Sequence, residues 1–181
     1  YQGFGDGLEE DREGLHVLLD TGLAVLVASS FSKNFGLYNE RIGAVTVVEE
    51  TENDAINTFS HIQTAIRAMY SSPPAHGGNV VATILSDASL KELWIEELGE
   101  MRTRISTMRQ AFVQQMAIRQ QVVDFDFINH QKGMFSFSGL TQEQVLKLRE
   151  DNHIYIVGSG RINVAGITPS NLEPLCDAVA K

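Results

Sequence analysis

Apolar and polar positions in the first half of the chain alternate between runs of strand length and stretches of helical spacing. Residues 23–28 (LAVLVA) form a continuous apolar run, which is typical of a strand buried on both faces. Residues 42–48 (IGAVTVV) predict a second strand, in which Gly43 and Ala44 would allow another group to approach closely. Helices are predicted over residues 9–20, 53–70, 75–85 and 88–119, with Ser71-Ser72-Pro73-Pro74 ending the second and Ser86 or Asp87 capping the last.

The second half carries shorter elements. Strands are predicted near 124–128, 134–138, 154–157 and 161–164, and helices over 141–152 and 168–180, the last with Thr168 as N-cap and Pro169 at its first position. The order of elements predicts an α/β part over residues 1–95 and a smaller α+β part over 96–181. The boundary lies within the helix at 88–119, which at roughly 30 residues spans about 45 Å. A helix of that length commonly joins two lobes.

The composition narrows the class of protein. Hydrophobic residues make up 43% of the 181 residues and charged residues 20%, which is the balance of a folded globular protein. The net charge of -9 disfavours nonspecific binding to nucleic acid, because phosphates would be repelled. No apolar run reaches the roughly 18 residues of a membrane span. The single cysteine, Cys176, fits a reducing compartment, and His76 and His153 lack metal-ligand spacing, so no metal site is predicted.

Lys33 follows the apolar run at 23–28, where a lysine is usually a surface residue with a buried stem. Its neighbours favour a ligand site instead. The end of such a strand is the usual ligand site of an open α/β sheet, and Ser30 and Ser32 lie there with it. Arg41 begins the next strand and can return to the same crevice. Two hydroxyls and a guanidinium suit a phosphate, and an amine beside them suits an aldehyde cofactor that bears one.

Five blocks along the chain resemble class I aminotransferases, most closely the bacterial aspartate and aromatic amino acid enzymes. The blocks are YQGF at 1–4, SFSKNFGLYNERIG at 30–43, SSPPAHG at 71–77, GMFSFSGL at 133–140 and SGRINV at 159–164. They occur in the family's order and at its spacing, so the resemblance covers essentially the whole chain. A lone Ser-x-Ser-Lys would be a weak signal, whereas five ordered blocks are very specific.

The resemblance implies roles for residues in the cofactor site. Lys33 matches the Schiff-base lysine, which also moves the proton between the substrate α-carbon and the cofactor. Ser30 and Arg41 match ligands of the cofactor phosphate. Tyr1 matches the tyrosine that hydrogen-bonds the cofactor's 3-oxygen and lowers the imine pKa. Ser71 matches a phosphate contact that is given to the neighbouring subunit.

Three further positions match residues that contact the substrate. Arg161 matches the arginine that binds the α-carboxylate, for which a planar guanidinium is suited and lysine is not equivalent. Arg67 matches the arginine that reaches across the dimer interface to the side-chain carboxylate of a dicarboxylic substrate. Phe135 matches an aromatic residue that lines the substrate pocket. By residue type alone, both arginines would be read as solvated surface residues and Phe135 as core.

The resemblance implies an α/β fold: part of the large fold type I domain of pyridoxal-phosphate-dependent transferases, followed by a small α+β C-terminal domain. The cofactor would be pyridoxal 5'-phosphate, the substrates an amino acid and a 2-oxo acid, and the assembly a cytoplasmic homodimer with shared active sites. Residues 1–11 (YQGFGDGLEED) resemble a strand end and a loop. Because members of the family are about twice this length, we expect the chain to be the C-terminal half of such a protein.

Two alternatives to an active aminotransferase remain open. One is a related pyridoxal-phosphate lyase, although paired arginines at positions 67 and 161 suit a dicarboxylate and argue against it. The other is a noncatalytic truncated fragment. In the family, the other half carries the aspartate that pairs with the cofactor's ring nitrogen, so these residues alone are expected to be inactive. Because aspartate and aromatic enzymes share all five blocks, the sequence leaves the preferred amino acid open.

Overall fold

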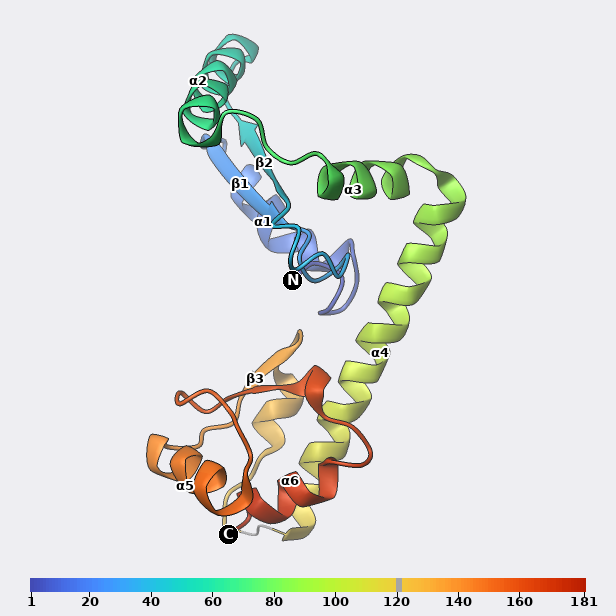
Figure 1. Ribbon diagram of the computed structural model, residues 1–181, viewed down its shortest axis with the longest axis vertical. Coiled ribbons are helices and arrows are strands. Elements are labelled where there is room, and N and C mark those ends of the chain that lie inside the picture. Colours follow the sequence, from blue (N-terminus) through green and yellow to red (C-terminus); the bar gives the residue numbers. More distant parts are fainter. Residues whose placement is uncertain (120–121) are drawn as a thin grey trace. The chain divides into compact units, whose positions relative to one another are not determined.

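The computed structural model describes residues 1–119 and 122–181, which form two compact units. The first unit contains Tyr1–Gly3 and Gly7–Leu98, and the second contains Phe4–Asp6 and Gly99–Lys181. The change of unit after Leu98 falls within the long helix α4 (Ala88–Arg119), which is green to yellow in Figure 1. The assignment of residues 1–95 to a large cofactor-binding domain and 96–181 to a small domain stays a prediction.

The first unit is built on an antiparallel pair of strands, β1 (Val25–Ser30) and β2 (Gly43–Val48). Their register pairs Val25 with Val48 at one end and Ser30 with Gly43 at the other. The predicted close approach at Gly43 is present, because a Cβ there would lie 2.4 Å from the Ser29 carbonyl oxygen. Only glycine therefore fits at the end of the pair where the connection to Lys33 begins.

The prediction that the first strand is buried on both faces is wrong for this chain. Leu26 of β1 is 68% exposed and Val45 of β2 is 60% exposed. In the described part of the chain, the β1–β2 sheet has two strands only. A run of apolar residues indicates that a strand is suited to burial. Whether the strand is buried depends on neighbouring strands and covering helices. The result is a two-stranded sheet with solvent-exposed apolar side chains.

The helices of the first unit lie close to their predicted positions. They are η1 (Glu10–Arg12), α1 (Glu13–Leu19), α2 (Glu52–Tyr70), α3 (His76–Ser86) and the first turns of α4. The Thr51 side chain caps α2 by accepting from the Asp54 backbone N–H at 3.1 Å. Asp87 caps α4 by accepting from the backbone N–H groups of Ser89 and Leu90. Hydrogen bonds from Ser89 and Leu90 lower the pKa of the Asp87 carboxyl.

The second unit has a well-formed apolar core around the later turns of α4. Its elements are η2 (Asp126–His130), β3 (Phe135–Phe137), α5 (Gln142–Asn152), β4 (Arg161–Asn163), η3 (Val164–Gly166) and α6 (Leu172–Val179). Strands β3 and β4 pair antiparallel, with Ser136 opposite Ile162. The fully buried side chains include Phe112, Met116, Ile128, Val164 and Cys176. Thr141 caps α5 in a reciprocal capping box with Gln144.

Two strands predicted in this unit are absent from the described residues. The segment 124–128 enters a 3-10 helix instead, because the Asp124 carboxylate accepts from the Asp126 N–H at 2.8 Å and turns the backbone. Residues 154–157 are not part of a ladder, although their exposure alternates, and a turn closes them with the Gly160 N–H on the Val157 carbonyl. The alternation predicts which side chains of this segment are exposed, but it does not specify a partner strand.

The last helix begins later than predicted. It runs over Leu172–Val179, and its N-cap is Asn171 rather than Thr168. Thr168 instead starts a turn, in which its carbonyl accepts from the Asn171 and Leu172 N–H groups. Both residues are good cap formers, so the composition alone did not separate a turn from a first helical turn. Across the described residues, no helix has both the length and the apolar character needed to cross a membrane.

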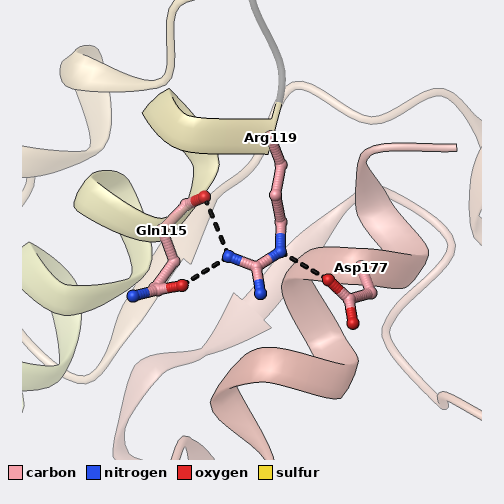
Figure 2. A network of polar contacts seen from close by, with 3 residues as sticks. All are labelled: Gln115, Arg119 and Asp177. Atoms are coloured by element: carbon pink, nitrogen blue, oxygen red, sulfur yellow. Dashed lines mark hydrogen bonds and ion pairs between the residues drawn. The ribbon is translucent and has the colours of Figure 1, made fainter.

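A polar network joins the end of α4 to α6 within the second unit, as Figure 2 shows. The Arg119 guanidinium donates to the Asp177 carboxylate and to both the carbonyl and the side chain of Gln115. Asp177 raises the pKa of Arg119, chiefly by accepting its hydrogen bond. The neighbouring Cys176 is fully buried, and burial raises the pKa of its thiol to about 11, so it is an inert core residue.

Candidate functional site

Lys33 lies in the connection between β1 and β2, and this connection is closed at its base. The Phe31 N–H donates to the Ile42 carbonyl at 3.2 Å, directly beyond the last paired residues of the two strands. The Gly36 N–H donates to the Lys33 carbonyl at 3.1 Å, and Gly36 has a φ of 67°, which favours glycine. The lysine is thereby set on a tight turn, at the end of the only strand pair described in this unit.

Two tyrosine rings flank the amine of Lys33. The Nζ atom lies 4.2 Å from the centroid of the Tyr1 ring and 5.3 Å from that of Tyr38. Tyr1 is distant in sequence, so the fold brings together two residues that were predicted to serve one cofactor. Lys33 itself is half-buried, which keeps the amine accessible while the aromatic faces limit its positions.

The predicted phosphate ligands lie in or beside the same connection. The Ser30 hydroxyl donates to Ser32 Oγ at 3.1 Å; Ser30 is exposed and Ser32 is buried. Arg41 is exposed, its φ is 52°, and its guanidinium donates to the Tyr38 carbonyl at 3.0 Å. A positive φ is uncommon for a residue with a side chain, and such positions occur preferentially at functional sites.

Helix α3 supports the connection from one side. The Glu40 carboxylate contacts His76 Nδ1 at 3.0 Å. Gly77 follows at the start of α3, where a Cβ would lie 2.9 Å from Glu40 Cβ and 3.2 Å from Ile42 Cβ. The absence of a side chain at Gly77 therefore allows the helix to contact the lysine connection closely. His76 thus links the start of α3 to the lysine connection through Glu40.

A second support comes from α4, and the sequence analysis missed it. The indole N–H of Trp94 donates to the Asn34 carbonyl at 2.7 Å, and the Trp94 ring stacks on Phe35. Asn34 is buried, and its side-chain amide reaches the Gln2 carbonyl at 3.5 Å. One signal could have indicated this contact: Trp94 is the single tryptophan, and the N–H of a partly buried indole normally finds an acceptor.

In the second unit, Arg161 lies on β4 beside the ring of Phe135 on β3. The guanidinium carbon is 4.8 Å from the ring centroid, which is a cation–π geometry. Arg161 is exposed, so its N–H groups can meet a carboxylate while the ring orients the guanidinium plane. The two residues are diagonal neighbours across the ladder, because Arg161 pairs with Phe137 and Phe135 pairs with Asn163.

Gly160 shapes the backbone immediately before Arg161. Its φ is 77°, and a Cβ there would lie 2.7 Å from the Leu140 carbonyl oxygen. Its own carbonyl accepts from both the backbone N–H and the hydroxyl of buried Ser138, at 3.0 and 2.7 Å. The start of the Arg161 strand is thus held against residues 138–140, with no room for a larger residue than glycine.

Two further arginines of α4 support the strands that carry Arg161 and Phe135. Arg109 is buried, donates to the Gly133 carbonyl and lies 3.4 Å from the Ser136 hydroxyl; burial lowers the pKa of its guanidinium. Arg104 donates to the carbonyls of Ala165 and Ile167 at 3.0 and 2.8 Å. Neither was identified from the sequence, because a helical arginine is usually solvated and only the tertiary contacts distinguish these two.

Arg67 and Ser71 lie at the C-terminal end of α2, in the first unit. The Ser71 N–H donates to the Arg67 carbonyl at 3.1 Å, and Ser71 has a φ of 63°, in the left-handed region. Both residues are exposed. The backbone turn therefore presents the serine hydroxyl and the arginine from the same helix end, away from an apolar core.

The residues present fit a cofactor that bears an aldehyde and a phosphate. An accessible primary amine is held between aromatic rings, and hydroxyl groups and a guanidinium lie in the same strand connection. The side-chain oxygen of Asn34 is a further acceptor, buried beside Lys33 and without a hydrogen-bond partner in the described residues. In the second unit, an exposed guanidinium against an aromatic ring is suited to a carboxylate.

Comparison with known proteins assigns the chain to a family. The model of the family "Aminotransferase class I and II" matches residues 1–179, so the chain belongs to that family. It is 56% identical to the aspartate aminotransferase of Escherichia coli over 179 residues, which are 99% of this chain and 45% of that protein. It is 42% identical to the E. coli aromatic-amino-acid aminotransferase, over 99% of this chain and 45% of that protein.

A solved structure extends the comparison to three dimensions. The aromatic-amino-acid aminotransferase of Burkholderia pseudomallei, which is covalently bound to pyridoxal phosphate, matches with a TM-score of 0.96 at 44% identity. The match covers 99% of this chain and 45% of the solved one. The expected α/β fold of this enzyme class is therefore confirmed. The chain spans somewhat under half the length of the relatives it matches.

We predict that Gly160→Ala destabilises the second unit by about 2 kcal/mol or more, because a left-handed backbone costs an L-residue roughly 1–2 kcal/mol and the new methyl group meets a carbonyl oxygen. Gly158→Ala is the matched control, since a Cβ there meets nothing within 4 Å. Urea unfolding followed by circular dichroism measures the difference. Equal unfolding midpoints for the two variants would contradict the proposed fit at Gly160.

Proposed function

We propose that this chain is the C-terminal half of a pyridoxal-phosphate-dependent aminotransferase, which exchanges the amino group of an L-amino acid with a 2-oxo acid such as 2-oxoglutarate. The observation that carries the proposal is the Lys33 amine held 4.2 Å from the Tyr1 ring, in the connection that also contains Ser32 and Arg41. The amino acid is aspartate, an aromatic amino acid or both. The higher identity to an aspartate enzyme, 56% against 42%, favours aspartate.

Lys33 performs two tasks in this proposal. Its Nζ atom would hold the cofactor, and the same amine, when free, would carry the proton that leaves the substrate α-carbon. Pyridoxal phosphate, when bound, supplies the electron sink that makes this proton removable. The half-buried position of Lys33 between two tyrosine rings supports both tasks, because the amine must be accessible yet confined.

The remaining cofactor contacts come from polar groups of the first unit. Ser30 and Arg41 hold the phosphate, because an exposed hydroxyl and a guanidinium are suited to bind it. The Tyr1 phenol hydrogen-bonds the cofactor's 3-oxygen. Ser71 gives a phosphate contact to the neighbouring subunit of a homodimer, from the exposed end of α2.

Substrate carboxylates are bound by arginines. Arg161 binds the α-carboxylate, oriented by the face of Phe135, which also lines the substrate pocket. Arg67 reaches the side-chain carboxylate of a dicarboxylic substrate bound in the partner subunit. A lyase of the same fold is the weaker alternative, because two arginines suit a dicarboxylic substrate. We place the enzyme in the cytoplasm.

The exposed apolar surface of the first unit supports the assignment of the chain to half of a larger fold. Leu26, Val45, Phe59 and Met69 are each more than half exposed, on the two strands and on α2. Strand β2 contacts both β1 and α2, so these exposed apolar side chains lie on adjoining elements, as an interaction surface would require. We propose that the other half of the family fold and the partner subunit cover it, and that residues 1–181 alone are not a competent aminotransferase.

The assignment of Lys33 is tested by borohydride reduction of the full-length cofactor-loaded protein, followed by peptide mapping. We expect the pyridoxyl label on Lys33, because its amine is the one placed beside the tyrosine rings. Lys91, on α4 and exposed, is an internal control that should stay unlabelled. A label on a lysine other than Lys33 would reject the central assignment.

The division of the two carboxylates is tested by kinetics of arginine variants. Arg161→Ala should lower kcat/KM for all amino acids. The loss of transition-state stabilisation should be at least about 1.5–3 kcal/mol, since a charge-assisted hydrogen bond is lost. Arg67→Ala should lower kcat/KM for aspartate and glutamate far more than kcat/KM for phenylalanine and tyrosine. Gln63→Ala, one turn earlier on α2 and also exposed, is the control. Equal losses for both substrate classes in the Arg67 variant would refute its role.

Expression of residues 1–181 alone tests the proposal about the isolated half. With pyridoxal phosphate, aspartate and 2-oxoglutarate present, we expect no enzymatic turnover above that of the cofactor alone, and concentration-dependent association through the exposed apolar surface. The E. coli aspartate aminotransferase serves as the positive control. Steady turnover close to that of the control would show that the other half is dispensable.

A further inference from the structure

We propose that Trp94 is a positioning residue for Lys33: from α4, it fixes the strand connection so that the lysine amine stays beside the Tyr1 ring. This inference rests on the proposed function, because it concerns the lysine that would hold the cofactor. Trp94 contacts Asn34 and Phe35, which follow Lys33 in the sequence. It would act through the residues that follow Lys33 and, through them, on the segment that carries Tyr1.

Trp94 contacts both of the residues that follow Lys33 in the sequence. Its indole N–H donates to the Asn34 carbonyl at 2.7 Å, which is a short hydrogen bond for a nitrogen donor. Its ring stacks on Phe35, with centroids 4.6 Å apart and planes 15° from parallel. Phe35 in turn meets Phe31 edge to face, with centroids 5.4 Å apart. Both sides of Lys33 in the sequence are thus packed into one aromatic cluster.

Asn34 links this aromatic cluster to the segment that carries Tyr1. The side-chain amide of Asn34 reaches the carbonyl of Gln2 at 3.5 Å, and Gln2 is itself held by the hydrogen bond from its Nε2 to the Leu8 carbonyl at 2.8 Å. Asn34 is therefore bound by Trp94 through its backbone and bound to the Tyr1 segment through its side chain. Asn34 is therefore connected to both members of the pair, the Lys33 amine and the Tyr1 ring.

The buried side chain of Asn34 carries an energetic cost. Asn34 is only 9% exposed, and its side-chain oxygen is buried without a hydrogen-bond partner in the described residues. Burying an unpaired acceptor is unfavourable, so a purely structural contact would favour an apolar residue here. An amide is suited to the position if its N–H groups are needed to hold the Gln2 carbonyl. The polar group thus has a positional role, which space filling would not require.

The expected consequence follows from what each part of the indole does. In Trp94→Phe the aromatic packing on Phe35 is largely kept, but the Asn34 carbonyl loses its donor, so the connection gains freedom around Lys33. Misplacement of a reacting group by about 1 Å can cost up to about 100-fold in rate. Because Trp94 would act through the lysine connection, kcat should fall, by roughly 5- to 20-fold, while KM for aspartate changes little.

The experiment uses the full-length cofactor-loaded protein and compares wild type, Trp94→Phe and Glu96→Ala. Glu96 is an exposed neighbour on α4 and serves as the matched control. Five quantities are measured: the pyridoxyl label at Lys33, the pH midpoint of the cofactor's visible absorbance, kcat, KM and the melting temperature. We expect Trp94→Phe to keep the label, move the absorbance midpoint by roughly half a unit or more and lower kcat. Glu96→Ala should match wild type.

The outcomes separate this inference from the function on which it rests. If wild type carries no label on Lys33, the proposed function fails and the inference fails with it. If Lys33 is labelled but Trp94→Phe has the absorbance midpoint and kcat of Glu96→Ala, only the positioning role is overturned, even if the melting temperature falls. Should Trp94→Phe not fold, site-specific replacement of Trp94 by benzothienylalanine removes the N–H at constant shape, and the same readouts decide.

Discussion

The antiparallel pairing of β1 with β2 is the constraint on which the candidate cofactor site depends. Because Ser30 pairs with Gly43, the chain must leave and re-enter the ladder at the same end, and everything between is a single closed connection. Lys33 and Arg41 are carried on it. The ladder determines where the connection begins and ends, but not where its side chains point. Their orientation comes from the aromatic rings and helices that contact the connection from outside.

The sequence predicted the elements well where the local signal and the fold agree. The long helix is found over Ala88–Arg119 as expected, because Asp87 caps it locally and its sequence is rich in the helix formers Leu, Met, Glu and Arg. The motif residues could also be located, since the order of short blocks along the chain is specific. Lys33 was identified on this basis, and the structure adds the ring of Tyr1 beside it.

Most of the features that the sequence could not predict depend on contacts between distant residues. The apolar composition of β1 predicts that it is buried. Burial requires neighbouring strands or helices that cover it, and Leu26 remains exposed. Asp124 turned a predicted strand through a local side-chain hydrogen bond that alternation does not reveal. The Trp94–Asn34 contact joins residues 60 positions apart, and Arg109 resembles any helical arginine until the carbonyl of Gly133 is seen beside it. For Leu26, Trp94 and Arg109 the tertiary neighbours decide the role, whereas for Asp124 a local hydrogen bond does.

The division of the chain has a consequence for any attempt to separate its parts. Phe4–Asp6 belongs to the second unit, although residues on either side of it belong to the first, and Asp6 forms an ion pair with Lys132. Phe4 is only 4% exposed. A cut at the boundary after Leu98 would therefore leave the second unit without a buried phenylalanine and an ion-pair partner. The second unit is discontinuous in sequence, so a self-sufficient version of it would have to be made as a circular permutant or supplied with residues 4–6 as a separate peptide.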